Sequence, residues 1–152
     1  MTSALAPIKV LLVEDSPDDV LLTEEALRHG RMAKGLRVVR DGEEALDFLH
    51  RRGRYRAEPR PDLVLLDLHL PKMDGLEVLE EMKQSPRLRM LPVVAFTTST
   101  AEREVLRAYD SHVNAFVNKP LDVDGFIRAV RSIEEFYLKT VRLPKMRSIA
   151  VF

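Results

Sequence analysis

Short runs of Val, Ile and Leu alternate with longer amphipathic stretches along most of the chain, and this alternation limits the folds open to it. Apolar runs of this kind suit strands that are buried on both faces of a sheet, and the stretches between them suit crossover helices. Five strands are predicted, over residues 8–13, 36–40, 62–67, 92–97 and 113–118. The pattern indicates an α/β fold in which helices cover both faces of a parallel sheet.

The amphipathic stretches begin with polar residues, whose side chains can accept hydrogen bonds from the free N–H groups of a helix start. Such starts occur at residues 16–19, 41–44, 74–77 and 99–102. In the first of them, Pro17 occupies a position that proline favours. A last helix is expected from near Asp122, with one apolar face formed by Val123, Phe126, Ile127, Val130, Ile133 and Tyr137.

Composition narrows the classes of protein to consider. The 152 residues are enough for one compact core, so a single domain is expected over 1–140, followed by a tail at 141–152 and no separate output domain. Lys plus Arg and Asp plus Glu number 24 each, which gives no net charge to attract nucleic acid or anionic lipid. The absence of cysteine excludes disulfides, thiolate metal sites and thiol nucleophiles.

No segment of the sequence has the character of a leader or a membrane span. Residues 1–9 lack a basic segment followed by an apolar stretch. No apolar run approaches the roughly 18 residues that a membrane-spanning helix needs. A cytoplasmic protein without a membrane or nucleic-acid partner is therefore expected.

Charged and hydroxyl side chains follow the predicted strands. Glu14 and Asp15 follow the first strand, Asp67 ends the third, Thr97 ends the fourth, and Lys119 follows the fifth. Any one of these residues is more often a turn former or a solvated charge than part of a site. If the strand order is 2-1-3-4-5, however, strands one and three are neighbours and their carboxylates converge at one edge of the sheet.

Three converging carboxylates repel one another unless positive charge offsets them. Oxygen ligands without cysteine or a histidine pair favour Mg²⁺ over Zn²⁺. Lys119 would add an ammonium that can reach a phosphoryl oxygen, and Thr97 would add a hydroxyl donor. A carboxylate, a metal and a lysine around one point suit in-line phosphoryl transfer.

Four motifs carry a resemblance to a known family: VLLVEDSPDD, LVLLDLHLPKMDG, PVVAFTTST and FVNKP. In their order and spacing they resemble the response-regulator receiver domains of two-component signalling, and the chain is similar to the chemotaxis response regulator in size and layout. The resemblance covers roughly residues 8–139. It implies a flavodoxin-like, doubly wound sheet of five parallel strands in the order 2-1-3-4-5, with helices on both faces.

The resemblance also implies a ligand set for the metal. Asp67 is the expected phosphoacceptor and a metal ligand, together with Asp15 and the backbone carbonyl of His69, while Glu14 acts through water. The expected cofactor is Mg²⁺, with Mn²⁺ or Ca²⁺ as alternatives. The imidazole of His69 either tunes the attack of water on the phosphoaspartate or is merely solvated.

A switch is implied as well. Lys119 and Thr97 are the expected catalytic partners of Asp67, and Thr97 with Phe116 is the expected switch pair, in which the ring turns inward once the hydroxyl is drawn toward the phosphoryl group. Phe116 is read equally well as an ordinary core aromatic. The protein is expected to be a signalling switch with weak self-dephosphorylation, and not an enzyme that turns over a substrate.

Two departures from many receivers point to a subfamily. Residues 109–115 read YDSHVNA where many receivers have a small-residue turn, and the last helix runs into IEEFYLKTVRLP. Both features are similar to stand-alone receivers of cyanobacterial and other bacterial phytochromes. The resemblance implies a sensor histidine kinase, here a bacterial phytochrome, as partner and a homodimer through the last helix and the tail. A bulkier turn and a helix that happens to end in aromatics remain the plainer interpretation.

Two other functions share parts of this pattern. A hydrolase of the haloacid dehalogenase type also uses an aspartate nucleophile with Mg²⁺, but it needs a second aspartate two residues on, where this chain has His69. A flavodoxin-like cofactor binder would need a Gly- or Ser/Thr-rich phosphate loop after the first strand, where the sequence reads EDSPDD.

Overall fold

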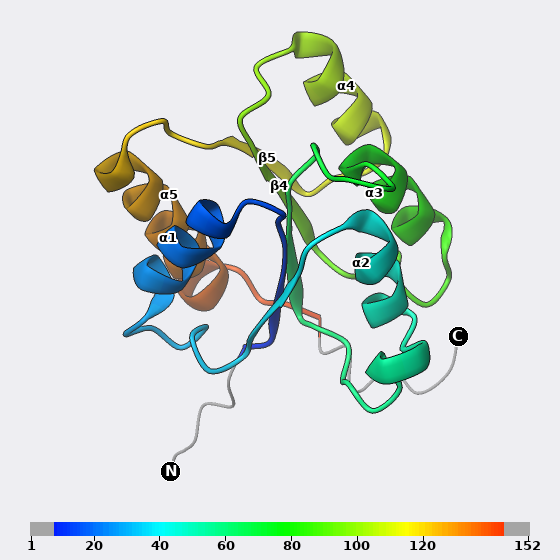
Figure 1. The fold of residues 1–152 in the computed structure, drawn as a ribbon. Coiled ribbons are helices and arrows are strands. Elements are labelled where there is room, and N and C mark those ends of the chain that lie inside the picture. Colours follow the sequence, from blue (N-terminus) through cyan, green and yellow to red (C-terminus); the bar gives the residue numbers. More distant parts are fainter. Residues whose placement is uncertain (1–7, 145–152) are drawn as a thin grey trace.

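The computed structural model describes residues 8–144. They fold around one five-stranded sheet (Figure 1). All neighbouring strands are parallel, in the order β2-β1-β3-β4-β5. The strands are β1 (Val10–Val13), β2 (Leu36–Val39), β3 (Leu63–Leu66), β4 (Val93–Thr97) and β5 (Ala115–Asn118). The predicted α/β fold and its strand order are confirmed.

The predicted strands are right in number and place but too long at their ends. The three central strands β1, β3 and β4 are buried along their whole length, as their continuous apolar runs indicate. The fifth run was predicted from Val113, yet β5 begins at Ala115 because the N–H of Val113 bonds back to the carbonyl of Ala108. Strand ends of this kind are set by turns, which apolar runs do not reveal.

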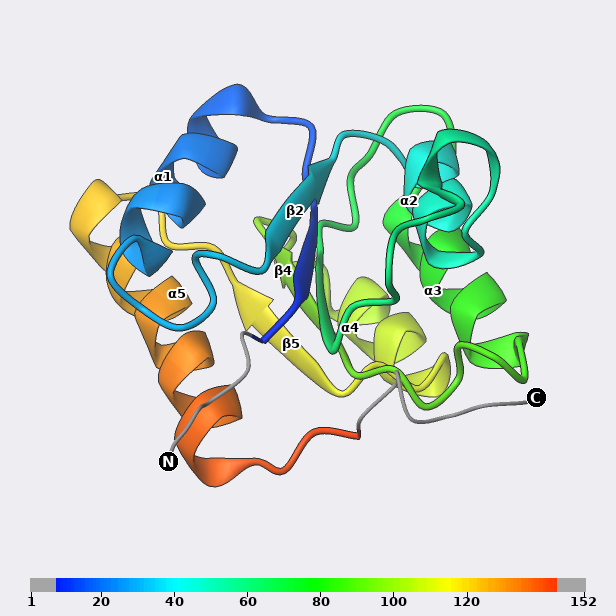
Figure 2. The same ribbon diagram turned by 90° about the horizontal axis from the view of Figure 1, so that it is seen from below.

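Helices cover both faces of the sheet (Figures 1 and 2). On one face α1 packs against α5, and α2, α3 and α4 cover the other face. Each face has its own cluster of buried side chains, so the core consists of two layers divided by the sheet. The helices are α1 (Pro17–Leu27), α2 (Gly42–Leu49), α3 (Gly75–Gln84), α4 (Glu102–Asp110) and α5 (Val123–Glu135).

Two short turns complete the described chain. A 3₁₀ turn at Gly53–Tyr55 lies in the connection from α2 to β3, and a π-helical turn at Phe136–Thr140 directly follows α5. Within residues 8–144, no helix combines the length and the apolar character that crossing a membrane requires.

The helix starts follow the predicted caps in three of the four places. The side chains of Ser16, Asp41 and Asp74 each accept a backbone N–H from the first turn of the helix that follows. The fourth prediction is wrong: α4 begins after Ala101 and has no side-chain cap. The reason is that the hydroxyl of Ser99 donates to the carboxylate of Glu104 instead of accepting from the helix.

The predicted buried face of α5 is correct except at its first residue. Phe126, Val130, Ile133 and Tyr137 are buried and Ile127 partly so, but Val123 is 56% exposed. Val123 is the first helical residue, directly after the capping Asp122, and lies at the exposed start of the helix. The apolar face therefore starts at Phe126.

These exposures predict a contrast between two identical substitutions in one helix. Val130→Ala should lower the free energy of unfolding by about 2 kcal/mol, because it removes two methyl groups from a side chain that is 1% exposed. Val123→Ala should change it by less than about 0.5 kcal/mol. Urea denaturation of both variants and the wild type measures the difference, and equal losses would contradict the placement of α5.

Candidate functional site

The predicted site residues meet at the carboxyl edge of the sheet, at the top of Figure 1, where the chain passes from each strand to its helix. Carboxylate oxygens of Glu14, Asp15 and Asp67 all lie within 4.8 Å of one another. Glu14 and Asp67 are buried and Asp15 is exposed. Strands β1 and β3 are direct neighbours, paired from Val10 with Leu63 to Val13 with Leu66, and this register brings the carboxylates together.

Lys119 is the electrostatic centre of this edge. Its Nζ donates to Glu14 Oε1 at 2.5 Å, to Asp19 Oδ2 at 2.8 Å and to Asp67 Oδ2 at 2.9 Å. The lysine side chain is only 3% exposed, and its ammonium lies 5.9 Å from the ring centre of Phe96. An ammonium has three donors, and here each of them meets a carboxylate.

The pKa values of the three central groups follow from burial and from this lysine. Burial raises the pKa of Glu14 to about 7, and the hydrogen bond from Lys119 only partly offsets that rise. Burial also acts to raise the pKa of Asp67, but the charge and hydrogen bond of Lys119 outweigh it, so the pKa of Asp67 is lowered. Burial acts to lower the pKa of Lys119, but its hydrogen bonds to carboxylates raise it overall.

The chain between β3 and α3 fixes the backbone of Asp67. The N–H of His69 donates to Asp67 Oδ1 at 3.1 Å, and the N–H of Gly75 donates to the carbonyl of Leu68 at 2.9 Å. A Cβ atom at Gly75 would lie 2.3 Å from the carbonyl oxygen of Asp67. Only glycine lets the start of α3 pack this closely against the strand end that carries Asp67.

Thr97 and Phe116 lie on neighbouring strands. Thr97 is fully buried, and a hydrogen bond from its hydroxyl helps to lower the pKa of Asp67. The side chain of Phe116 is partly buried and packs against the core on the face of α2 and α3. The N–H of Phe116 donates to the hydroxyl of Tyr109 in α4 at 3.2 Å, so α4 and β5 are joined beside the predicted switch pair.

Sequence reasoning missed two parts of this edge. Asp19 in the first turn of α1 is a third carboxylate on Lys119, and its signal in the sequence is the acidic pair after Pro17, which by itself indicates only a helix start. Glu104 binds both loops beside Asp67: Ser99 donates to it, and His69 Nε2 lies 3.4 Å from its Oε1. No sequence pattern singled out Glu104, because it looks like any acidic residue in a first helical turn.

The donor set of the carboxyl edge fits a hard divalent cation. Glu14, Asp15 and Asp67 offer only oxygen atoms, which suits Mg²⁺ or Mn²⁺ better than a metal that prefers sulfur or imidazole. Three carboxylates exceed the single positive charge of Lys119, so a cation would relieve the remaining repulsion.

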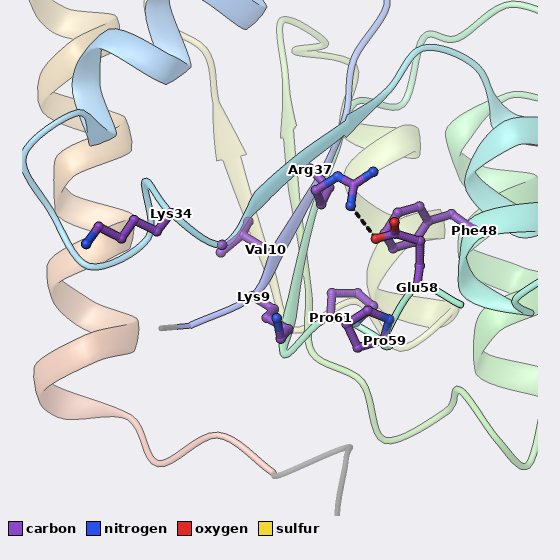
Figure 3. Close-up of a pocket in the computed structure, with 9 residues that line it drawn as sticks. Lys9, Val10, Lys34, Arg37, Phe48, Glu58, Pro59 and Pro61 are labelled. Atoms are coloured by element: carbon purple, nitrogen blue, oxygen red, sulfur yellow. Dashed lines mark hydrogen bonds and ion pairs between the residues drawn. The ribbon is translucent and has the colours of Figure 1, made fainter. Parts of the chain in front are cut away.

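A hollow of about 180 Å³ at the amino edge of the sheet has the opposite charge (Figure 3). It is lined by apolar side chains with Lys9, Lys34 and Arg37 around them, and the acidic residue of its lining, Glu58, is paired with Arg37. The acidic site and these basic residues therefore lie at opposite ends of the strands.

The sequence matches the response regulator receiver domain family over residues 10–131. Response regulator Rcp1 of Synechocystis sp. is 46% identical over 138 residues, which are 91% of this chain and 94% of Rcp1. The solved Mn²⁺-bound form of Rcp1 has a TM-score of 0.87 at 46% identity and covers 91% of this chain and 99% of its own.

Two further relatives have different biological settings. The phosphorylated cyanobacterial phytochrome response regulator RcpA has a TM-score of 0.89 at 44% identity, over 91% of this chain and 99% of RcpA. The probable methanogenesis regulatory protein FilR2 of Methanothrix harundinacea is 43% identical over 139 residues, or 91% of this chain and 88% of FilR2. The family match extends over most of this chain, and the chain covers these relatives almost end to end. The chain therefore belongs to the response regulator receiver domain family.

Proposed function

We propose that this receiver is a signalling switch in which Asp67 takes a phosphoryl group from a phosphohistidine of a sensor histidine kinase. One observation carries the proposal: Asp67 is a buried carboxylate with lowered pKa, held ionised by Lys119 where two other carboxylates converge. An ionised Asp67 oxygen would form the new P–O bond while the P–N bond to histidine breaks and the imidazole leaves.

Each neighbour of Asp67 has a part in this proposal. Lys119 neutralises charge on the phosphoryl oxygens, and Thr97 donates a hydrogen bond to them. Asp15, Asp67 and the carbonyl of His69 would hold Mg²⁺, with Glu14 acting through water; the ion would supply further neutralisation of phosphoryl charge. The bound Mn²⁺ of the relative Rcp1 supports this reading.

The proposed output is a change in a protein-binding surface. Drawing the Thr97 hydroxyl toward a phosphoryl group frees space beside β5, into which the ring of Phe116 would turn. Phe116 is only partly buried, so its ring has room to turn, and the bond from its backbone N–H to Tyr109 links this part of β5 to α4.

A bacterial phytochrome is the proposed source of the phosphoryl group, because RcpA is a phytochrome response regulator and is similar over nearly its whole length. The likeness to FilR2 shows that the same receiver type also occurs in another regulatory setting. A hydrolase of the haloacid dehalogenase type is not favoured, because His69 stands where that chemistry needs a second aspartate.

The acceptor can be tested by mass spectrometry of the intact protein. With Mg²⁺ and acetyl phosphate, or with an autophosphorylated phytochrome histidine kinase, the wild type should gain one phosphoryl group and Asp67→Asn none. After the donor is removed, slow loss of the group would show self-dephosphorylation. Equal labelling of both proteins would rule out Asp67 as the acceptor, and rapid release of phosphate from varied esters would favour a hydrolase.

Metal binding should depend on pH through Glu14. Its pKa is raised to about 7, so the metal-free chain holds a proton there at pH 6 and has lost it at pH 8. Because Mg²⁺ favours the ionised carboxylate, its affinity should rise about tenfold from pH 6 to pH 8, with release of a proton. Isothermal titration calorimetry measures both quantities. Glu14→Gln should remove the dependence, and an unchanged wild-type affinity would contradict it.

We also propose a homodimer through α5 and the residues after it. Phe136 is 49% exposed at the end of α5, and its ring meets that of Tyr137 edge to face. Val141 and Leu143 pack on the domain core, while the rest of the predicted tail, 145–152, lies outside the described residues.

Sedimentation velocity can test the dimer with two changes. A chain ending at Pro144 keeps the packed residues and removes only the last part, and Phe136→Ser removes the exposed ring. The full chain should sediment as a dimer, and at least one of the two variants should shift toward monomer. A monomeric full chain, with or without phosphorylation, would contradict the proposal.

A further inference from the structure

Glu104 in the first turn of α4 joins the two loops on either side of Asp67. Its Oε1 accepts the hydroxyl hydrogen of Ser99, in the loop from β4 to α4, and lies 3.4 Å from Nε2 of His69, in the loop from β3 to α3. The Glu104 side chain is 24% exposed and Ser99 is buried, so the Ser99 contact is not a loose surface pair, whereas the side chain of His69 is 56% exposed.

Both loops also bind Asp67 directly or through one neighbour. The N–H of His69 donates to Asp67 Oδ1 at 3.1 Å. On the other side, the N–H of Ser99 donates to Thr97 Oγ1 at 3.4 Å, and the Thr97 hydroxyl is bonded to Asp67. The contacts form a closed ring that starts and ends at Asp67 and has Glu104 as its far member.

The ring also holds the start of α4. This helix has no side-chain cap, so its first turn lacks the usual anchor. The bond from Ser99 to Glu104 ties that turn to the preceding loop, and the side-chain amide of Asn118 fixes the same loop from β5 by donating to the Ser99 carbonyl at 2.5 Å. A shift at Thr97 or Ser99 must therefore move α4 or break the bond to Glu104.

A phosphoryl group on Asp67 would change the balance inside the ring. It adds negative oxygens that need hydrogen-bond donors between the same two loops, where the Ser99 hydroxyl is already donated to Glu104 and His69 Nε2 lies 3.4 Å from the same carboxylate. The carboxylate of Glu104 would also repel the new charge. Both effects favour the unphosphorylated arrangement.

We propose that Glu104 is a positioning residue that holds Ser99, His69 and the start of α4 in the unphosphorylated state, and that its contacts must open for the phosphorylated state to form. The inference rests on Asp67 being the phosphoacceptor. The contacts of Glu104 exist only in the unphosphorylated state, so their free energy favours that state. Losing them must therefore strengthen the binding of a phosphoryl group or its mimic.

The first test compares Glu104→Ala with Glu102→Ala, which removes the same charge from the same helical turn but has no bond to either loop among the contacts of residues 8–144. The probe is trifluoroberyllate with Mg²⁺, a mimic of the phosphoryl group, titrated by NMR. The trifluoroberyllate concentration at half-saturation should fall about fivefold in Glu104→Ala and change less than about twofold in Glu102→Ala. Equal half-saturation concentrations in the two variants would overturn the proposal.

The second test needs neither metal nor phosphate. Amide hydrogen exchange at residues 99–104 should be faster in Glu104→Ala than in the wild type and Glu102→Ala, because Glu104 ties Ser99 and the first turn of α4 to each other and to His69. Ser99→Ala should give part of the same effect, and adding it to Glu104→Ala should give less than the sum of the two. Unchanged exchange would overturn the proposal. Failure of the wild type to bind trifluoroberyllate or to be labelled would instead overturn the assignment of Asp67.

Discussion

The carboxyl edge of this protein depends on one buried ammonium group. Lys119 carries a single positive charge among Glu14, Asp19 and Asp67, which come from the ends of β1 and β3 and from α1. Removing one partner of a buried ion pair typically costs about 3–5 kcal/mol, because the other charge stays buried without compensation. The lysine therefore holds together elements that would otherwise repel one another at this edge.

The layout of the fold follows from local rules that the sequence displays. Continuous apolar runs identify β1, β3 and β4 because both faces of these strands are covered, and polar starts identify three helices because unpaired N–H groups need acceptors. The convergence of Glu14, Asp15 and Asp67 then follows from strand order alone, since neighbouring parallel strands end at the same edge. These features depend on the path of the backbone.

What could not be predicted depends on which way individual side chains turn. Ser99 looks like a helix cap but donates to Glu104, and Asp19 looks like a charge at a helix start but completes the shell around Lys119. Val123 has the right spacing for the buried face of α5 but is exposed as the first residue of the helix. Such choices are decided by partners far away in the chain, and residue spacing carries no information about them.

Equal numbers of acidic and basic residues do not make this protein electrically featureless. Among the described residues, the carboxylates of the site gather where the strands end, and Lys9, Lys34 and Arg37 lie near where the strands begin. A positively charged patch on an approaching partner would be attracted to the acidic end more than to the basic end. In physiological salt this preference acts over about 8 Å, so these charges bear on the direction from which a partner approaches.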